Sequence, residues 1–241
     1  MNIQPIEKRV NSDGASLQVH SIFKTIQGEG PFTGQRSIFI RLAGCNLQCP
    51  SCDTDYTSNR RTETFWNIAE DCSKAAENPK DYLVVITGGE PFRQNITLLC
   101  RELIKRRFRV QIETNGTMAP SPGFAELHGA NPDNSFVIIS PKAGKINKEI
   151  EWLCDAYKYV LKADSVNQED GLPILALDHT AQPQVARPNI EHRAYKIPIY
   201  LQPLDEANLA SNLLNKAAVL ESCMSHGYIL QLQIHKILGV E

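Results

Sequence analysis

Short apolar runs alternate along this chain with segments whose apolar residues recur every three to four positions. Runs rich in β-branched and aromatic residues predict strands, and a recurrence near 3.6 predicts helices. Strands are expected at residues 17–24, 37–43, 82–91, 108–116, 135–142, 156–162, 197–203 and 228–235, and helices at residues 63–76, 95–107 and 206–225. Because strands that alternate with helices form a parallel sheet with right-handed crossovers, the pattern predicts an α/β protein built as a partial (β/α)6 barrel.

The length of the chain, 241 residues, suits one domain of this architecture, which we place at residues 1–241. Residues 1–17 are expected to form a polar lead-in. Residues 163–196 interrupt the alternation of strands and helices with a Pro- and Gln-bearing stretch. We interpret them as an insertion without assigned chemistry.

Charge and composition narrow the choice of partners. The formal net charge of −2 gives no long-range attraction to nucleic acid, and the chain has no apolar run long enough to span a membrane. Because the N-terminal residues also lack the apolar stretch of a secretory signal, a reducing, cytoplasmic location is expected. The seven cysteines are then expected to be metal ligands or buried thiols rather than disulfides.

Three of the cysteines stand close together directly after the strand at residues 37–43. Cys45, Cys49 and Cys52 follow a C-x3-C-x2-C spacing. A zinc site normally has four protein ligands, usually as two pairs, whereas three thiolates suit a 4Fe–4S cluster with one iron left free. The alternatives are three unligated thiols and a zinc site that borrows a distant ligand. The other four cysteines lie in predicted helices or beside apolar residues and are expected to be buried.

Other unusual segments also fall where predicted strands end. TGGEP (residues 87–91), ETNG (113–116) and SPK (140–142) each close a strand. In a barrel of parallel strands the carboxyl ends of the strands form one face, so these segments and the cysteines predict a single site. Each segment alone has a plain alternative, such as a turn or a helix start. TIQGEG (25–30) matches no dinucleotide or phosphate-loop fingerprint and could be a hairpin turn.

Arg41 lies in the middle of a predicted strand, where a buried cation needs an anionic partner. That partner is either a substrate carboxylate, which fits the fork of the guanidinium group, or an acidic side chain of the protein itself.

The cysteine spacing followed by TGGEP resembles the radical S-adenosylmethionine (SAM) superfamily. TIQGEG together with CDT (52–54) and SPK is similar, more narrowly, to the family of 7-carboxy-7-deazaguanine synthases, and matching segments run from Phe23 almost to the C-terminus. The resemblance implies a partial barrel of the radical SAM type. It also implies a lyase that converts 6-carboxy-5,6,7,8-tetrahydropterin to 7-carboxy-7-deazaguanine with loss of ammonia, in 7-deazapurine (queuosine-type) biosynthesis.

The resemblance further implies the cofactors and partners: a 4Fe–4S cluster, SAM, Mg²⁺, a reduced flavodoxin or ferredoxin as electron donor, and a homodimer. The reacting radical would come from SAM and remove hydrogen from C6 of the pterin, so no side chain is expected to be catalytic by itself.

Roles for individual residues follow from the same resemblance. The cluster ligands would be Cys45, Cys49 and Cys52, and Thr54 would ligate Mg²⁺. The residues expected to contact SAM are Ser51, Cys52, Asp53, Gly88, Gly89, Glu90, Ser140, Pro141 and Lys142. The residues expected to contact the pterin are Ile26, Gln27, Gly28, Glu29, Arg41, Thr87 and His235. Ser51 departs from the superfamily, which usually has an aromatic residue before the third cysteine.

Two other functions share part of this pattern. A glycyl-radical activase of the same superfamily would carry the cysteines and TGGEP but has no reason to carry TIQGEG. A zinc-binding module would account for the cysteines alone, and metal analysis distinguishes it because it would contain zinc without iron.

Overall fold

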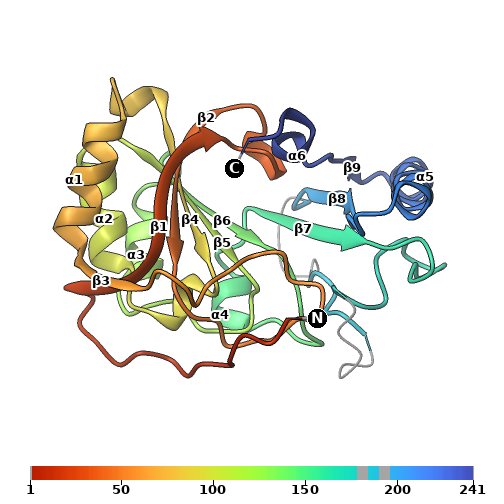
Figure 1. Ribbon diagram of the computed structural model, residues 1–241. Coiled ribbons are helices and arrows are strands. Elements are labelled where there is room, and N and C mark those ends of the chain that lie inside the picture. Colours follow the sequence, from red (N-terminus) through yellow and green to blue (C-terminus); the bar gives the residue numbers. More distant parts are fainter. Residues whose placement is uncertain (1, 178–183, 190–195, 241) are drawn as a thin grey trace.

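The computed structural model describes residues 2–177, 184–189 and 196–240. Within these residues, nine strands form one open, curved sheet with the order β3-β1-β2-β4-β5-β6-β7-β8-β9 (Figure 1). The strands are β1 (Ser16–Ile26), β2 (Arg36–Leu42), β3 (Arg61–Thr64), β4 (Leu83–Gly88), β5 (Arg109–Thr114), β6 (Ser135–Ile139), β7 (Ala156–Leu161), β8 (Ile199–Pro203) and β9 (Ile229–Leu230). The sheet ends at β3 and β9 without closing, which confirms the predicted partial barrel.

The strands from β2 to β9 run parallel, as the alternation of strands and helices predicts. At the other end, β1 pairs antiparallel with β2 and with β3. Because β2, β4, β5 and β6 lie side by side with the same polarity, their carboxyl ends meet at one edge. The segments that the sequence placed after these strands therefore come together.

Helices pack around this sheet. The α-helices are α1 (Phe65–Ala75), α2 (Thr97–Lys105), α3 (Phe124–Gly129), α4 (Lys148–Glu151), α5 (Leu209–His226) and α6 (Ile234–Leu238), and the 3-10 helices are η1 (Gly30–Phe32), η2 (Pro79–Asp81) and η3 (Pro91–Arg93). Figure 1 shows α1, α2 and α3 grouped beside the first half of the sheet and α5 beside β8 and β9. The predicted helices at residues 63–76, 95–107 and 206–225 match α1, α2 and α5 within three residues at each end. No helix of the described residues is long and apolar enough to cross a membrane.

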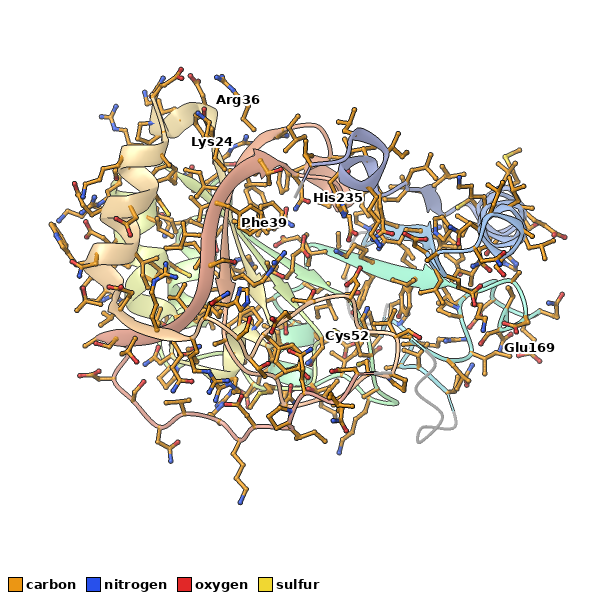
Figure 2. The ribbon with its side chains drawn as sticks, in the orientation of Figure 1. Lys24, Arg36, Phe39, Cys52, Glu169 and His235 are labelled. Atoms are coloured by element: carbon orange, nitrogen blue, oxygen red, sulfur yellow. The ribbon has the colours of Figure 1, made fainter. Side chains whose placement is uncertain are left out.

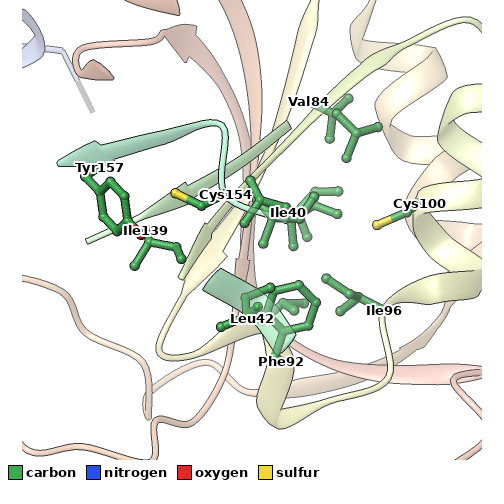
Figure 3. Packing of buried hydrophobic residues seen from close by; sticks show 14 of the residues in the cluster. Ile40, Leu42, Val84, Phe92, Ile96, Cys100, Ile139, Cys154 and Tyr157 are labelled. Atoms are coloured by element: carbon green, nitrogen blue, oxygen red, sulfur yellow. The ribbon is translucent and has the colours of Figure 1, made fainter. Parts of the chain in front are cut away.

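The core lies between the first strands and the outer helices. Figure 3 shows Ile40 of β2 and Val84 of β4 facing Cys100 of α2 and Ile96, which immediately precedes that helix. In β4 the four residues from Leu83 to Ile86 are all fully buried, as expected for a parallel strand covered on both faces. Cys72, Cys100, Cys154 and Cys223 are buried free thiols, which confirms their predicted role as small core residues.

The predicted closing strand at residues 228–235 is wrong for most of its length. Only Ile229 and Leu230 pair with β8. The chain then leaves the sheet because it bonds to the loop after β1: the backbone N–H of Ile234 donates to the carbonyl of Gly28 at 3.2 Å. Residues 231–233 form neither strand nor helix, and α6 begins at Ile234. The alternating apolar pattern here therefore belongs to a segment that packs on a loop rather than to a strand.

The lead-in and the insertion are more structured than the sequence indicated. Residues 2–10 run along the cysteine loop and bond to it, and β1 already begins at Ser16. In the described part of 163–196, Arg187 forms an ion pair with Asp170, and the hydroxyl of Tyr159 donates to the carbonyl of Ala186 at 2.7 Å. Residues 178–183 and 190–195 of the predicted insertion lie outside the described residues.

Candidate active site

A cavity of about 530 Å³ opens at the carboxyl ends of the parallel strands. Its volume lies within the range of small-molecule sites. The loop after β2 contributes the three clustered cysteines to the lining. The end of β4 contributes Thr87 to Gly89, and the end of β5 contributes Glu113 to Asn115. The segment after β6 adds Ser140 and Lys142. The segments that the sequence places at strand ends therefore line one cavity. Figure 2 shows Phe39, Cys52 and His235, which come from three different segments, around this inner side of the sheet.

Nearly all residues that the sequence singled out line this cavity. The structure describes all of these residues, and among them only Glu90 and Pro141 do not line the cavity. Those that line it are Ile26, Gln27, Gly28, Glu29, Arg41, Cys45, Cys49, Ser51, Cys52, Asp53, Thr54, Thr87, Gly88, Gly89, Ser140, Lys142 and His235.

The cysteine loop is held by the N-terminal segment. The backbone N–H of Glu7 donates to the carbonyl of Cys45 at 2.7 Å, and the side-chain amide of Asn2 donates to the carbonyl of Cys49 at 3.2 Å. Gln4 donates to the carbonyl of Thr54 at 2.9 Å and accepts from the N–H of Tyr56 at 2.8 Å. The loop is thus fixed from outside while its thiols face the cavity.

The three thiols fit a cluster that opens into the cavity. Burial raises the pKa of Cys45 to about 12 and also raises the pKa of Cys49 and Cys52, so a positively charged metal centre is needed to hold them as thiolates. No three His, Cys, Asp or Glu side chains of the described residues converge on a point suited to a single metal ion. Because the thiols border a cavity of ligand size, a 4Fe–4S cluster bound by them would present its remaining iron to that cavity.

The glycine pair at the end of β4 permits close contact with the cysteine loop. A Cβ atom on Gly88 would overlap with the backbone of Leu42, and one on Gly89 would overlap with the carbonyl of Gly44. The N–H of Gly89 donates to the carbonyl of Leu42 at 3.1 Å. Side chains at these two positions would therefore push the cysteine loop away from β4.

Glu90 is bound within the protein. Its carboxylate is fully buried and accepts from the N–H of Phe92 at 3.0 Å, the hydroxyl of Thr114 at 2.7 Å and the N–H of Asn115 at 2.8 Å. Burial raises its pKa, and these hydrogen bonds oppose the shift. The geometry gives Glu90 the role of joining the ends of β4 and β5.

A buried ionic network lines another part of the cavity. The ammonium of Lys158, on β7, lies 2.5 Å from Glu29 and 3.0 Å from Glu113. Burial alone would raise the pKa of Glu29, but the charge and hydrogen bond of Lys158, together with a hydrogen bond from Gln233, lower it to about 2. Glu29 is therefore available as an ionised hydrogen-bond acceptor beside Glu113.

Arg41 reaches the cavity beside two aromatic rings. Its guanidinium group lies over the ring of Phe23 at 5.1 Å, and that ring stacks on Phe39 at 5.4 Å. In the sheet register Arg41 is the direct neighbour of Thr87. A cation and a hydroxyl thus stand next to each other at the cavity wall, in a setting suited to a carboxylate ligand.

Helix α6 covers the cavity from the C-terminal side. A Cβ atom on Gly28 would overlap with the imidazole of His235, so the two residues are in close contact. The next residue, Lys236, lies 3.2 Å from Asp53 and 3.4 Å from Asp205. The helix therefore joins the TIQGEG loop, the cysteine loop and the end of β8.

Several lining residues escaped the sequence reasoning. These are Phe23, Phe39, Leu47, Glu113, Thr114, Asn115, Lys158, Val160, Leu177, Gln202, Leu204, Asp205, Gln233, Lys236 and Val240. A usable signal existed for two groups: Lys158 is a charge in the middle of a strand, like Arg41, and Glu113 to Asn115 belong to the noted ETNG segment. The missed residues Gln233, Lys236 and Val240 carried no such signal, because the sequence predicted a strand up to residue 235 and no helix there.

An open parallel sheet, with three cysteines after its first parallel strand and a glycine pair ending the next, defines a radical SAM protein. A family model described as "Radical SAM superfamily" matches residues 39–158. A 7-carboxy-7-deazaguanine synthase of Rickettsia prowazekii is 37% identical over 245 residues, covering 98% of this chain and 94% of the relative. One from Rhodospirillum rubrum is 37% identical over 240 residues, covering 95% and 94%.

A solved structure with the same fold is the crystal structure of QueE from Escherichia coli, with a TM-score of 0.65, 23% identity and coverage of 93% of this chain and 99% of that one. The chain belongs to the 7-carboxy-7-deazaguanine synthase family of the radical SAM superfamily. Radical SAM proteins use a 4Fe–4S cluster and SAM, for which the cysteine side of the cavity is suited.

Proposed function

We propose that this protein is a radical SAM lyase that converts 6-carboxy-5,6,7,8-tetrahydropterin to 7-carboxy-7-deazaguanine with loss of ammonia, in 7-deazapurine (queuosine-type) biosynthesis. The observation that carries the proposal is one cavity with two chemically different walls. Three thiols form one wall, and the other presents carboxylates, amides and a guanidinium group. When bound, the cluster and SAM supply the radical that removes hydrogen from C6 of the pterin.

The cysteine wall would bind the cofactors. Cys45, Cys49 and Cys52 would hold the cluster, and the backbone at Gly88 and Gly89 would approach the methionine end of SAM. Ser51, Cys52, Asp53, Ser140 and Lys142 are proposed to contact the rest of SAM. Glu90 and Pro141, which the sequence also assigned to SAM, lie outside the lining and are proposed to support the lining residues beside them. Ser51 offers no ring for stacking, so adenine would be held there by backbone contacts.

The part of the lining that carries Glu29, Gln27 and Arg41 would bind the pterin. Its 2-aminopyrimidinone edge carries N–H donors and a carbonyl, which suit Glu29, Gln27 and the backbone of Ile26 and Gly28. Arg41 and Thr87 would bind the substrate carboxylate, and His235 would close over it.

We propose that Thr54 would hold Mg²⁺, which would supply positive charge for the substrate carboxylate. The Thr54 hydroxyl lines the cavity beside Asp53, and hard cations such as Mg²⁺ take oxygen ligands completed by waters and substrate.

We further propose that the chain acts as one domain, residues 1–241, in the cytoplasm, with a flavodoxin or ferredoxin as electron donor. The continuous sheet supports one domain, and seven free cysteines suit a reducing compartment. A homodimer is supported by exposed apolar side chains along one face of α5, namely Leu213, Leu220 and Met224, which are 57%, 53% and 80% exposed.

The test is a product assay. Anaerobic enzyme, reduced and supplied with SAM, Mg²⁺ and 6-carboxy-5,6,7,8-tetrahydropterin, is expected to release 7-carboxy-7-deazaguanine and ammonia in equal amounts, measured by absorbance and mass spectrometry. Radical transfer to a partner protein without pterin turnover would favour the activase instead.

A further inference from the structure

Lys158 is a charged residue inside a buried strand. Along β7, Tyr157 and Tyr159 point into the core, whereas Lys158 and Val160 line the cavity, as the two-residue alternation of a strand requires. Only 6% of the Lys158 side chain is exposed. An ammonium group at such a position is retained only with charged partners, and it has two.

Both partners are also held by side-chain amides. Lys158 bonds one oxygen of Glu29 and one oxygen of Glu113. The other oxygen of Glu29 accepts from the amide of Gln233 at 2.6 Å, and the other oxygen of Glu113 accepts from the amides of Gln27 at 3.0 Å and Gln111 at 2.8 Å. Each carboxylate oxygen has two lone pairs, so Glu29 and the Lys158-bound oxygen of Glu113 can still accept a hydrogen bond from a ligand in the cavity.

We infer that Lys158 is a positioning residue whose ammonium group keeps Glu29 and Glu113 together as paired acceptors for the N–H groups of the pterin's 2-aminopyrimidinone edge. The inference rests on the proposed function and deepens it, because it names what selects that edge of the ring. Lys158 acts through the carboxylates; its own hydrogen bonds point at them rather than at a ligand.

The physical reason is like-charge repulsion in a dry environment. Without the ammonium group, two neighbouring buried carboxylates cannot both stay ionised, and one takes up a proton. A protonated carboxyl presents an O–H donor toward the N–H donors of the pterin, so binding weakens. The other charged groups facing Glu29 and Lys158 are Lys142 after β6 and His235 on α6, both cationic when protonated.

Replacing Lys158 tests this inference. Lys158→Met removes the charge and keeps the length of the side chain, and Lys158→Arg keeps the charge. The control is Arg106→Met: Arg106 also bridges two carboxylates, Glu102 at 2.8 Å and Glu70 at 2.7 Å, but in the outer layer formed by α1 and α2. Affinity for 6-carboxypterin is measured by anaerobic calorimetry from pH 6 to pH 8 on cluster-loaded protein with SAM. Dividing each variant's affinity by the wild-type affinity at the same pH removes the effect of the ligand's own titration.

The expected result for Lys158→Met is a loss of affinity on the order of thirty-fold near neutral pH. The loss should grow as the pH falls, because the raised carboxyl pKa then leaves one acid protonated. Lys158→Arg and Arg106→Met should each keep a pH-independent ratio to wild type. If Lys158→Met does not fold, Lys158→Gln takes its place with the same expectation.

The inference would be overturned if the affinity of Lys158→Met relative to wild type stays near one or does not vary with pH. It would also be overturned if the relative affinity of Lys158→Arg shows the same pH dependence. Product formation by the wild type separates the two claims. Normal turnover with a flat Lys158→Met profile contradicts only the role of Lys158, whereas absence of both product and carboxypterin binding contradicts the proposed function as well.

Discussion

Two charged residues inside strands, Arg41 and Lys158, mark the substrate wall of the cavity. Both lie in strands whose neighbouring residues are buried, and both turn toward the cavity instead of the core. A cation in a strand interior is unfavourable unless an anion meets it. Such residues therefore indicate a polar cavity even when the sequence does not reveal which anion is present.

Gly28 gives a direct test of the contact between the TIQGEG loop and α6. We expect Gly28→Ala to displace His235, because the added methyl group occupies the space of its imidazole. KM for the pterin should rise about tenfold or more while the melting temperature changes little, since misplacing one contact weakens binding without removing core packing. Steady-state kinetics and thermal unfolding measure the two effects.

The control for that substitution is Gly129→Ala, because a methyl group there meets no other atom within 4 Å. An unchanged KM in Gly28→Ala would show that α6 does not close on the loop in solution.

At the residue scale, the sequence predicts which side chains carry chemistry better than it predicts which residues they contact. The cysteines, the glycine pair and Arg41 were predictable because few environments tolerate those residue types in those patterns. The role of Glu90 was not, because a carboxylate offered to a ligand and one bound by Thr114 and Asn115 have the same sequence signature. Lys158 was predictable by the argument applied to Arg41, but its two partners come from distant segments.

At the scale of elements, the ends of the parallel strands determine the site. Apolar runs identified β2, β4, β5 and β6, and their shared polarity brings the following segments together. The error at residues 228–235 has the opposite cause: α6 is short, and its position depends on hydrogen bonds to Gly28 rather than on its own pattern. The conformation of the polar lead-in likewise depends on its hydrogen bonds to the cysteine loop.

The N-terminal segment is expected to protect the metal centre. Gln4→Ala removes the amide that bonds the backbone at Thr54 and Tyr56. Leaving such groups without partners costs about 1–3 kcal/mol. The variant should lose iron faster than wild type in the presence of a chelator, measured by the decay of cluster absorbance under anaerobic conditions.

Ile3→Ala serves as the control in the same segment, since Ile3 is 88% exposed. Equal rates of iron loss in Gln4→Ala and wild type would show that the segment does not hold the cysteine loop.

At the scale of the whole molecule, α5 carries an uncovered apolar face. Leu220→Glu places a charge in the line of Leu213 and Met224 and should convert a dimer to a monomer, as measured by light scattering after size-exclusion chromatography. Leu214→Glu is the matched control, because it makes the same change on an exposed leucine of α5 about 100° around the helix from Leu213. A wild-type monomer, or a dimer unaffected by Leu220→Glu, would contradict this interface.

The central claim concerns the whole site: three thiolates hold a 4Fe–4S cluster whose open iron faces the cavity. Anaerobic metal analysis combined with electron paramagnetic resonance tests it most directly. The account predicts roughly four irons and four sulfides per chain, and a reduced-cluster spectrum that changes when SAM is added. Zinc without iron, or a cluster spectrum that SAM leaves unchanged, would contradict it.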